Sequence, residues 1–375
     1  MNSDPEEIRG LFPITHESIY FNHAATGPMS VPARKAIEEC IAVYTRQAEF
    51  RTSDYFARVH AARKTVAQLI RAKPEEIAFT HNTSEGIYIA LINLPLTQRA
   101  KVLVMDEVFP AVRYVVDYNL PYLEKKYIPF RGRDVVEAVK GHLDKRVKAV
   151  VVDHVQYLSG EMIDLKSLSA FLKNRGIYLI VDGIQAIGAV DFSVSDTEID
   201  FLACGGAKWL FGPSGTGFLY VNRRNFGRLR RFHTGWLGAE WSSFENCDQK
   251  PSLYDDARMF EQGTRNIIGI SAFSENVKIL LKYGLADIER KILDLVAELR
   301  RGFRDLNLEI ITPEHGLRSG IITTRPSKDA KALYSRLADE SIITSLRSNC
   351  LRFSPHFYNT QEEVEQILRV LKATL

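Results

Sequence analysis

The sequence predicts an α/β fold, in which a large domain is built on a mostly parallel sheet and a smaller α+β domain follows it. From about residue 55 to residue 225, short apolar runs alternate with amphipathic stretches. That alternation is typical of parallel strands joined by helices. After about residue 266, long helical patterns lead into a short mixed segment. We therefore expect a large domain over residues 17–266 and a small C-terminal domain over residues 267–375, joined by the N-terminal segment 1–16.

Short apolar runs are the expected strands of the large domain. Several consist almost entirely of valine, isoleucine and leucine, as is usual for strands that are buried on both faces of a sheet. The runs are residues 77–80, 101–105, 147–152, 177–181, 201–203 and 217–221.

Helical patterns fill the intervals between these runs. Residues 55–72 carry apolar side chains at three- and four-residue spacing. Asp164 and Gly176 are residue types that begin and end a helix. Further helices are expected over residues 268–283, 286–306 and 361–374.

The overall composition is that of an ordinary globular protein. Of the 375 residues, 45% are hydrophobic and 25% are charged, and the formal net charge is only +3. Neither nucleic acid nor a membrane is therefore indicated as a partner, and no apolar run approaches the ~18 residues of a membrane span. Cys40, Cys204, Cys247 and Cys350 are scattered without a CxxC pair, so no disulfide framework and no metal site is indicated. We expect a cytoplasmic enzyme.

Ligands of open α/β sheets bind at the carboxyl ends of the strands, so the polar residues that follow the apolar runs are candidates. Thr83 and Ser84 precede an apolar helix, where hydroxyls and free N–H groups suit a phosphate. Asp182 ends a buried run, which is costly unless a cation such as a protonated pyridine nitrogen pairs with it. Gln185, in the next turn, could reach the phenolic oxygen of that ring. Simple helix capping is the alternative for Thr83, Ser84 and Asp182.

Lys208 follows a buried strand in an apolar, glycine-rich turn. Burial lowers the pKa of a lysine and makes its amine nucleophilic, whereas a lysine that extends to the surface is the alternative. Trp209 stands where a phosphate-binding Walker loop has Ser or Thr, and no GxGxxG follows the first strand. Arg352 lies in an apolar strand and can hold a carboxylate with two hydrogen bonds; a structural ion pair is the alternative.

Taken together, these segments resemble the class-V aminotransferase family of fold-type-I pyridoxal-5′-phosphate (PLP) enzymes. That family includes cysteine desulfurases, isopenicillin N epimerase-like proteins, cystine lyases and kynureninase. The resemblance runs from about residue 20 to residue 359. Its motifs occur in order: THNTSEG at 80–86, VDGIQA at 181–186, CGGAKW at 204–209, FEQGTRN at 260–266 and LRFSPH at 351–356. It implies a PLP transferase with a seven-stranded sheet, an amino-acid substrate and a homodimer with shared active sites.

The resemblance implies a role for each candidate. Lys208 would form a Schiff base with PLP and would act as general base and acid at the substrate Cα. Asp182 would pair with the pyridinium nitrogen, which keeps the ring an electron sink. Gln185 would hydrogen-bond the phenolate oxygen, and Thr83 and Ser84 would bind the phosphate.

Other positions receive a role only through the resemblance. Phe109 would stack on the ring, and Tyr157 would line the pocket near the ring oxygen and the substrate. Thr264 would reach the phosphate of the neighbouring subunit, and Arg352 would clamp the substrate α-carboxylate. His23 lies in the segment that family members fold over the site, so it is a candidate substrate-binding residue; a structural histidine is the alternative.

The chain departs from the desulfurases in two places. Gly205 and Ala207 stand where desulfurases often have a Ser and a His on the phosphate. Cys350 lies two residues before Arg352, which leaves no room for the loop that carries their catalytic cysteine. Strand alternation would place the thiol on the face of Arg352, and a small core residue is the alternative.

The sequence does not distinguish transamination, lyase chemistry and epimerisation, because all three reactions begin with proton removal at Cα. The leading interpretation is a PLP enzyme of the class-V aminotransferase type. A cysteine desulfurase, C–S lyase or epimerase is the first alternative, and a protein that binds PLP without turnover is the second.

Overall fold

A seven-stranded sheet forms the centre of the computed structural model, which describes residues 5–241, 244, 248–327 and 329–375. The strand order is β2-β8-β7-β6-β5-β3-β4. β8 is antiparallel to both of its neighbours, and the other pairs are parallel. The predicted α/β fold with a mostly parallel sheet is confirmed. The strands are β2 (Ile77–Thr80), β3 (Lys101–Met105), β4 (Glu124–Ile128), β5 (Val147–Asp153), β6 (Tyr178–Asp182), β7 (Phe201–Gly205) and β8 (Gly217–Val221).

The sequence predicts every strand of this sheet except β4. The missing strand lies at the edge beside β3 and reads Glu-Lys-Lys-Tyr-Ile. Its side chains are mostly exposed or half-buried, unlike those of the central strands. Charged residues suit an edge strand because they discourage pairing with another chain, so β4 shows no apolar run.

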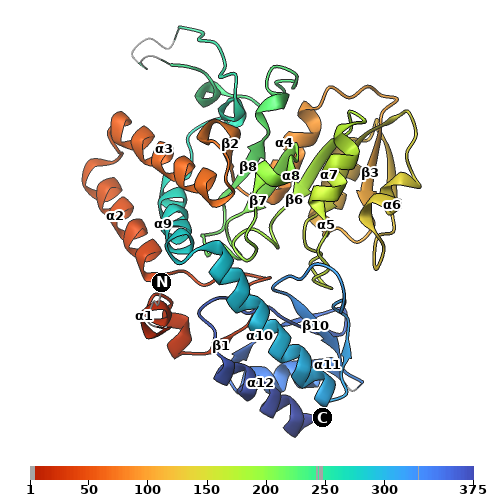
Figure 1. Cartoon of the computed structure of the whole chain (residues 1–375). Helices are drawn as coiled ribbons and strands as arrows, with labels where there is room; N and C mark the ends of the chain where they lie inside the picture. The colour runs from red at the N-terminus through yellow and green to blue at the C-terminus, as the bar shows by residue number, and fades with distance from the viewer. Residues whose placement is uncertain (1–4, 242–243, 245–247, 328) are drawn as a thin grey trace.

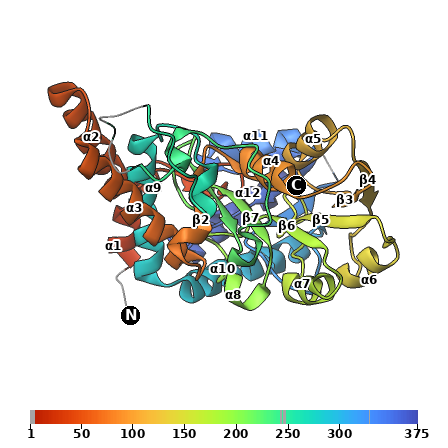
Figure 2. The same ribbon diagram turned by 90° about the horizontal axis from the view of Figure 1, so that it is seen from above.

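Helices cover both faces of the sheet, with α4 and α5 on one face and α6, α7 and α8 on the other (Figure 2). α2, α3 and α9 pack together at the β2 end (Figure 1). Asp164 caps α7 as predicted, since its side chain accepts a hydrogen bond from the N–H of Ser167. The helices are α2 (Val31–Gln47), α3 (Thr52–Leu69), α4 (Thr83–Asn93), α5 (Pro110–Asn119), α6 (Val135–Lys140), α7 (Leu165–Lys173), α8 (Val194–Thr197) and α9 (Ile267–Tyr283).

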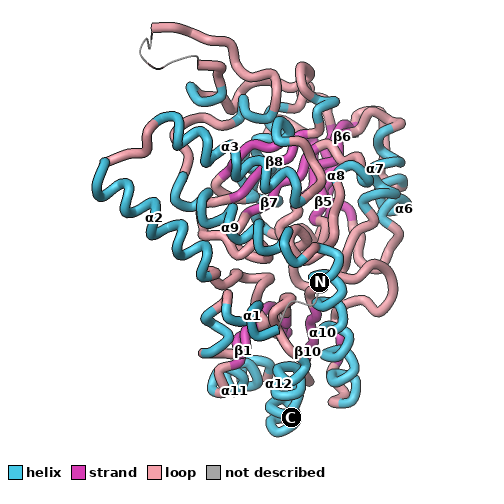
Figure 3. Tube along the Cα trace, turned by 60° about the vertical axis from the view of Figure 1, so that its left-hand side comes forward, coloured by secondary structure: helices cyan, strands magenta, loops and turns pink. Residues whose placement is uncertain are grey.

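A second, smaller body contains a four-stranded antiparallel sheet of order β12-β13-β10-β9 (Figure 3). The N-terminal segment joins it, because β1 (Ile19–Tyr20) pairs with β11 (Ile342–Ile343). α9 packs on α2 and α3 of the large sheet's body, whereas α10 packs on β9, β10 and α12; the exact domain limits stay a prediction. The remaining elements are α1 (Pro5–Gly10), α10 (Leu285–Asp305), β9 (Glu309–Ile310), β10 (Ile322–Arg325), α11 (Ala330–Asp339), β12 (Ser345–Arg347), β13 (Cys350–Phe353) and α12 (Gln361–Thr374).

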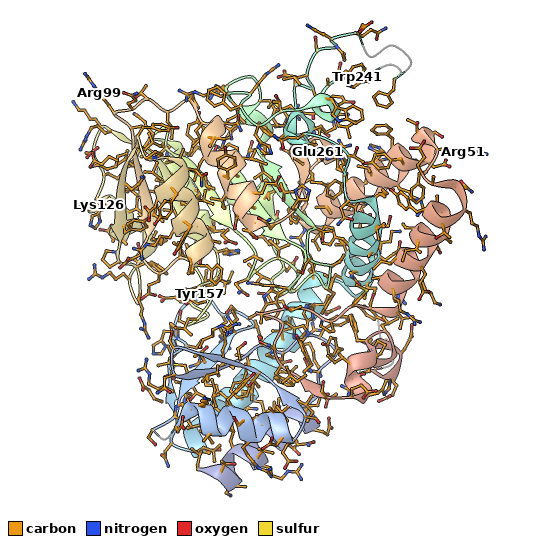
Figure 4. All side chains as sticks on the ribbon, turned by 180° about the vertical axis from the view of Figure 1, so that it is seen from behind. Arg51, Arg99, Lys126, Tyr157, Trp241 and Glu261 are labelled. Atoms are coloured by element: carbon orange, nitrogen blue, oxygen red, sulfur yellow. The ribbon has the colours of Figure 1, made fainter. Side chains whose placement is uncertain are left out.

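The carboxyl ends of the central strands face the smaller body. Tyr157, which follows β5, lies at the junction of the two bodies in Figure 4. This junction is therefore where the candidate residues have to be sought. Among the described residues, no helix combines the length and the apolar character that crossing a membrane requires.

Candidate active site

The loop that follows β7 holds Lys208 against the N-terminal segment. The N–H of Gly27 donates to the carbonyl oxygen of Ala207 at 2.9 Å. A Cβ built on Gly27 would lie 2.1 Å from the carbonyl oxygen of Lys208, so only glycine allows this approach. On the other side, Trp209 is buried and donates its Nε1–H to Gln185 at 2.9 Å. The backbone is therefore fixed on both sides of Lys208.

The Lys208 amine is poised to act as a nucleophile. Burial lowers its pKa to about 8, although the negative charge of Asp182 opposes the shift. At pH 7 about a tenth of such a group is neutral, far more than of an ordinary lysine. Its Nζ lies 5.5 Å from the centroid of the Phe109 ring, so Phe109 borders the amine; the role of Phe109 toward the cofactor stays a prediction.

Asp182 ends β6 as a buried carboxyl without a cationic side chain to pair with. It is 3% exposed, and its Oδ1 accepts a hydrogen bond from the N–H of Ile184 at 2.9 Å. Among the described residues, no Lys, Arg or His forms an ion pair with it. Burial raises its pKa to about 6, whereas Lys208 lowers it. The Lys208 amine acts on this carboxyl from beyond ion-pair distance, so the carboxylate can accept a closer positive group.

The structure adds Asp153, which the sequence interpretation does not include. Asp153 ends β5 and pairs in register with Asp182 on β6. It is 6% exposed, and its Oδ2 accepts a hydrogen bond from the N–H of Phe109 at 3.0 Å. Its Oδ1 has no partner in the described structure. The signal in the sequence is a carboxyl that ends a valine run, as Asp182 does.

Thr83 and Ser84 form the first turn of α4, as predicted. Asn82 is the N-cap, and its side chain accepts a hydrogen bond from the N–H of Glu85 at 2.9 Å. The Thr83 hydroxyl accepts a hydrogen bond from the N–H of Gly205 at 2.9 Å. A Cβ on Gly205 would lie 3.2 Å from that hydroxyl oxygen, which is tighter than an ordinary contact. Gly205 thus lets the end of β7 pack closely against the start of α4, where backbone N–H groups suit an anion.

Arg352 is a buried guanidinium that no described carboxylate neutralises. It lies on β13 and is 2% exposed. Its Nη1 donates to the carbonyl oxygen of Tyr157 at 2.6 Å, and its Nη2 donates to the Ser345 hydroxyl at 3.3 Å. Its Nε–H has no partner among the residues that the structure describes. Burial lowers its pKa to about 10, and repulsion from Arg347 adds to the shift.

Tyr157 connects Arg352 to the region of Lys208. Its carbonyl oxygen holds Arg352, and its ring meets the Phe109 ring edge-on with centroids 5.2 Å apart. Because Phe109 borders the Lys208 amine, these four residues enclose one side of the site. The structure therefore brings Lys208, Phe109, Tyr157 and Arg352 together, although they come from four separate segments of the chain.

Gln185 and His23 are buried and hydrogen-bonded within the protein. Gln185 donates its Nε2–H to the carbonyl oxygen of Ala24 at 2.9 Å and accepts from Trp209. His23 is fully buried, with Nδ1 at 2.8 Å from the carbonyl oxygen of Ser354 and Nε2 at 2.7 Å from the Tyr358 hydroxyl. Burial lowers the pKa of His23 to about 3. Both ring nitrogens of His23 are therefore occupied, and its role toward a substrate stays a prediction.

Thr264 lies at the surface rather than beside Lys208. It is exposed and lines a cavity of about 270 Å³ together with Thr80, His81 and Gly215. Three residues earlier, Glu261 is buried and pairs with both Arg63 and Arg265. Figure 4 shows Glu261 and Tyr157 well apart in the same chain. The rigid network at Glu261 thus holds the Thr264 segment at the outside of the large body.

Cys350 is part of a tight hairpin between β12 and β13. Ser348 and Asn349 form the turn with φ of 48° and 57°. Cys350 is 1% exposed, and its thiol donates a weak hydrogen bond to the carbonyl oxygen of Ser348 at 3.5 Å. The short turn leaves no extended loop to carry a mobile cysteine. Cys247 lies outside the described residues.

Comparison with known proteins agrees with this geometry. The family described as aminotransferase class-V matches residues 19–367. An uncharacterized aminotransferase of Bacillus subtilis is 26% identical over 372 residues, covering 98% of each chain. A probable cysteine desulfurase of Pyrococcus abyssi is 28% identical, covering 98% of this chain and 97% of its own. The apo structure of a cysteine desulfurase from Thermococcus onnurineus superposes with a TM-score of 0.88 at 26% identity, covering 100% and 99% of the two chains.

Proposed function

Since the chain belongs to the class-V aminotransferase family, we propose that it is a PLP-dependent enzyme that acts on an α-amino acid through Lys208. The buried Arg352 carries this proposal. A buried cation without a neutralising anion costs several kcal/mol, and its free Nε–H faces no protein acceptor. An α-carboxylate supplies both the missing charge and the missing acceptor. The guanidinium geometry suits two parallel hydrogen bonds to a carboxylate.

The residues around Lys208 fit PLP. Asp182 would face the ring nitrogen, because it is a buried acid without a cation of its own. Thr83, Ser84 and the N–H groups at the start of α4 would hold the phosphate, close to Gly205 at the end of β7. Phe109 would lie against the ring. When bound, PLP supplies an electron sink for the negative charge that develops at the substrate Cα.

Lys208 has two tasks in this proposal. Its amine would hold the cofactor, which the lowered pKa favours. Its Nζ would also take a proton from the substrate Cα and return it, as a general base and then a general acid. Arg352 fixes the substrate by its carboxylate, so that Cα lies within reach of Nζ. Gln185 acts on the site by holding Trp209, the neighbour of Lys208.

For the reaction, we favour transamination over cysteine desulfuration. The relatives include both an aminotransferase and probable cysteine desulfurases. The desulfurase mechanism needs a thiolate that can reach the substrate, whereas the Cys350 thiol is buried in a two-residue hairpin. A buried thiol without room to move packs as a small apolar residue.

We further infer that the protein acts as a homodimer with shared active sites. Thr264 is exposed, and it lines an aromatic cavity of about 630 Å³ with Tyr44, Tyr55, Trp236 and Trp241. A large exposed apolar surface of this kind is usually covered by a partner. A second copy of the chain would place Thr264 at the phosphate of its neighbour. Free thiols at Cys40, Cys204 and Cys350 suit a reducing, cytoplasmic compartment.

The test of the proposed function is a covalent label. Purified protein incubated with PLP should show the visible absorption of a lysine-bound cofactor, and borohydride followed by peptide mass spectrometry should find the label on Lys208. Lys208→Ala should abolish both signals, while Lys278→Ala, a surface lysine on α9, should retain them. Wild-type protein without a visible band and without a reducible label would refute the proposal.

Subunit mixing tests the shared site. Lys208→Ala and Thr264→Ala homodimers should both be impaired. After the two variants are unfolded and refolded together, the mixed dimer contains one site with both residues intact, so activity should return. A monomer in sedimentation, or a mixture no more active than its parts, would contradict the dimer.

A further inference from the structure

The carboxyl of Asp153 has no role in the chemistry described so far. It is buried at the carboxyl end of β5, directly opposite Asp182 on β6. One of its oxygens accepts the N–H of Phe109, and the other has no partner in the described structure. A polar atom that is buried and unpartnered in a packed protein calls for an explanation.

Ionising Asp153 and Asp182 at the same time is unfavourable, because like charges in a buried site repel strongly. Burial and the neighbouring Asp182 raise the pKa of Asp153 well above its ordinary value. A backbone N–H and the Lys208 charge stabilise the ionised form of both carboxyls, and the pKa of Asp182 is raised only to about 6. The buried Oδ1 of Asp153 has no partner among the described residues, so an ionised Asp153 would leave negative charge there without a hydrogen bond, and we assign the proton to Asp153.

The other titratable groups around the pair do not change this assignment. Lys208, from the loop after β7, is the cation that faces both carboxyls. Cys204 on β7 stays a neutral thiol, because burial and Asp182 raise its pKa. His154, the neighbour of Asp153, stays a neutral imidazole, because burial lowers its pKa to about 4. Past the end of β3, burial also raises the pKa of Glu107.

We propose that Asp153 is a protonated positioning residue of the cofactor site, which holds Phe109 in place and leaves Asp182 as the single negative charge beside Lys208. This inference rests on the proposed function, and it concerns which carboxyl of the site carries charge. Oδ2 accepts the Phe109 N–H, and the proton on Oδ1 is a donor for an acceptor that the bound cofactor would supply.

The position of Phe109 shows why this contact matters. Phe109 precedes Pro110 at the start of α5, and its side chain provides no cap of its own. Asp153 satisfies the Phe109 N–H and thereby fixes the backbone of the residue whose ring borders Lys208. An ionised Asp153 would also raise the pKa of Lys208, as its charge contributes in that direction. A protonated Asp153 avoids that loss of nucleophilic amine.

Infrared difference spectroscopy of the holoenzyme tests the protonation. A carboxylic acid and a carboxylate have well-separated C=O stretching bands. The wild-type spectrum minus that of Asp153→Asn should show a carboxylic acid band at neutral pH. The matched control is Asp106→Asn, which removes an exposed carboxylate paired with Arg113 and should show carboxylate bands only. If Asp153→Asn does not fold, Asp153→Thr supplies a neutral hydroxyl and should give the same acid band. A carboxylate signal at Asp153 would overturn the proposal.

PLP affinity tests the positioning role. Asp153→Asn retains an acceptor for the Phe109 N–H, so its dissociation constant for PLP should stay within about threefold of the wild-type value. Asp153→Ala removes the acceptor and should weaken PLP binding about tenfold, the usual effect of one lost hydrogen bond. The visible circular dichroism of the bound cofactor should change only in Asp153→Ala. Equal affinities and spectra in all three proteins would overturn this role. Failure of the wild type to bind PLP would instead refute the proposed function. The same infrared comparison, repeated on the protein without PLP, tells the two failures apart.

Discussion

Replacing Arg352 by glutamine separates a substrate-binding arginine from a structural one. A guanidinium has five N–H donors, and the protein uses only one on Nη1 and one on Nη2. The free Nε–H and the second Nη2 donor lie on one edge, which matches the two oxygens of a carboxylate. A charge-assisted hydrogen bond contributes about 1.5–3 kcal/mol. Two of them correspond to roughly 10²–10⁴-fold weaker binding when they are lost.

Stability should respond differently from binding. A buried arginine in a structural ion pair leaves an unpaired acid when it is removed, at a cost of about 3–5 kcal/mol. Arg352 has no such acid among the described residues, so Arg352→Gln relieves a buried charge while it loses the contacts to Tyr157 and Ser345. The two effects oppose each other, and the free energy of unfolding should change by no more than about 1 kcal/mol.

The assay compares an amino acid with the amine that lacks its carboxylate. Substrate binding is followed by the change in cofactor absorbance, and stability is followed by thermal unfolding of the same samples. Arg352→Gln should weaken binding of the amino acid roughly 10²–10⁴-fold and leave binding of the amine unchanged. Arg336→Gln, a surface arginine on α11 paired with Glu340, is the control and should behave as wild type. Equal losses for both ligands, or a large loss of stability in Arg352→Gln, would refute the assignment.

Other residues of the site give independent predictions. Because burial lowers the pKa of Lys208 to about 8 and only the neutral amine attacks, stopped-flow capture of PLP by the apoprotein should accelerate with pH up to about 8 and then level off; acceleration that continues to pH 10 would contradict this. Thr83→Val removes the hydroxyl that accepts the Gly205 N–H, so it should weaken PLP binding about 10- to 100-fold in a fluorescence titration. An unchanged affinity would exclude Thr83 from the phosphate site. Cys350→Ala should retain full activity on every amino acid that the wild type accepts, including cysteine, and loss of cysteine turnover alone would restore the desulfurase alternative.

Residues whose role follows from their own strand were predictable from the sequence. Asp182 and Lys208 stand directly after long apolar runs, so their burial at one edge of the sheet follows from the fold class. The edge strand β4 was not predictable from hydrophobicity, because its side chains alternate between solvent and the sheet.

Residues whose role depends on contacts between distant segments were not predictable in the same way. Asp153 matters because β5 and β6 are neighbours in the sheet, which the chain order alone does not state. His23 and Gln185 have residue types that suit a substrate or a cofactor. Their actual partners, Ser354, Tyr358 and Trp209, come from segments far along the chain. No local pattern contains that information.

The two buried charges of the site are the strongest sign that it is built for a ligand. Among the described residues, Asp182 forms no ion pair and Arg352 meets no carboxylate. Pairing them with each other would relieve both desolvation costs, yet the fold places them on different sheets, with Lys208 influenced by both. A chain selected for stability alone would pair them or replace them by apolar residues. Their separation places a negative group on β6 and a positive group on β13. PLP joined to an amino acid has the matching charges, with a pyridinium at one end and a carboxylate at the other, so binding should stabilise the protein by neutralising both.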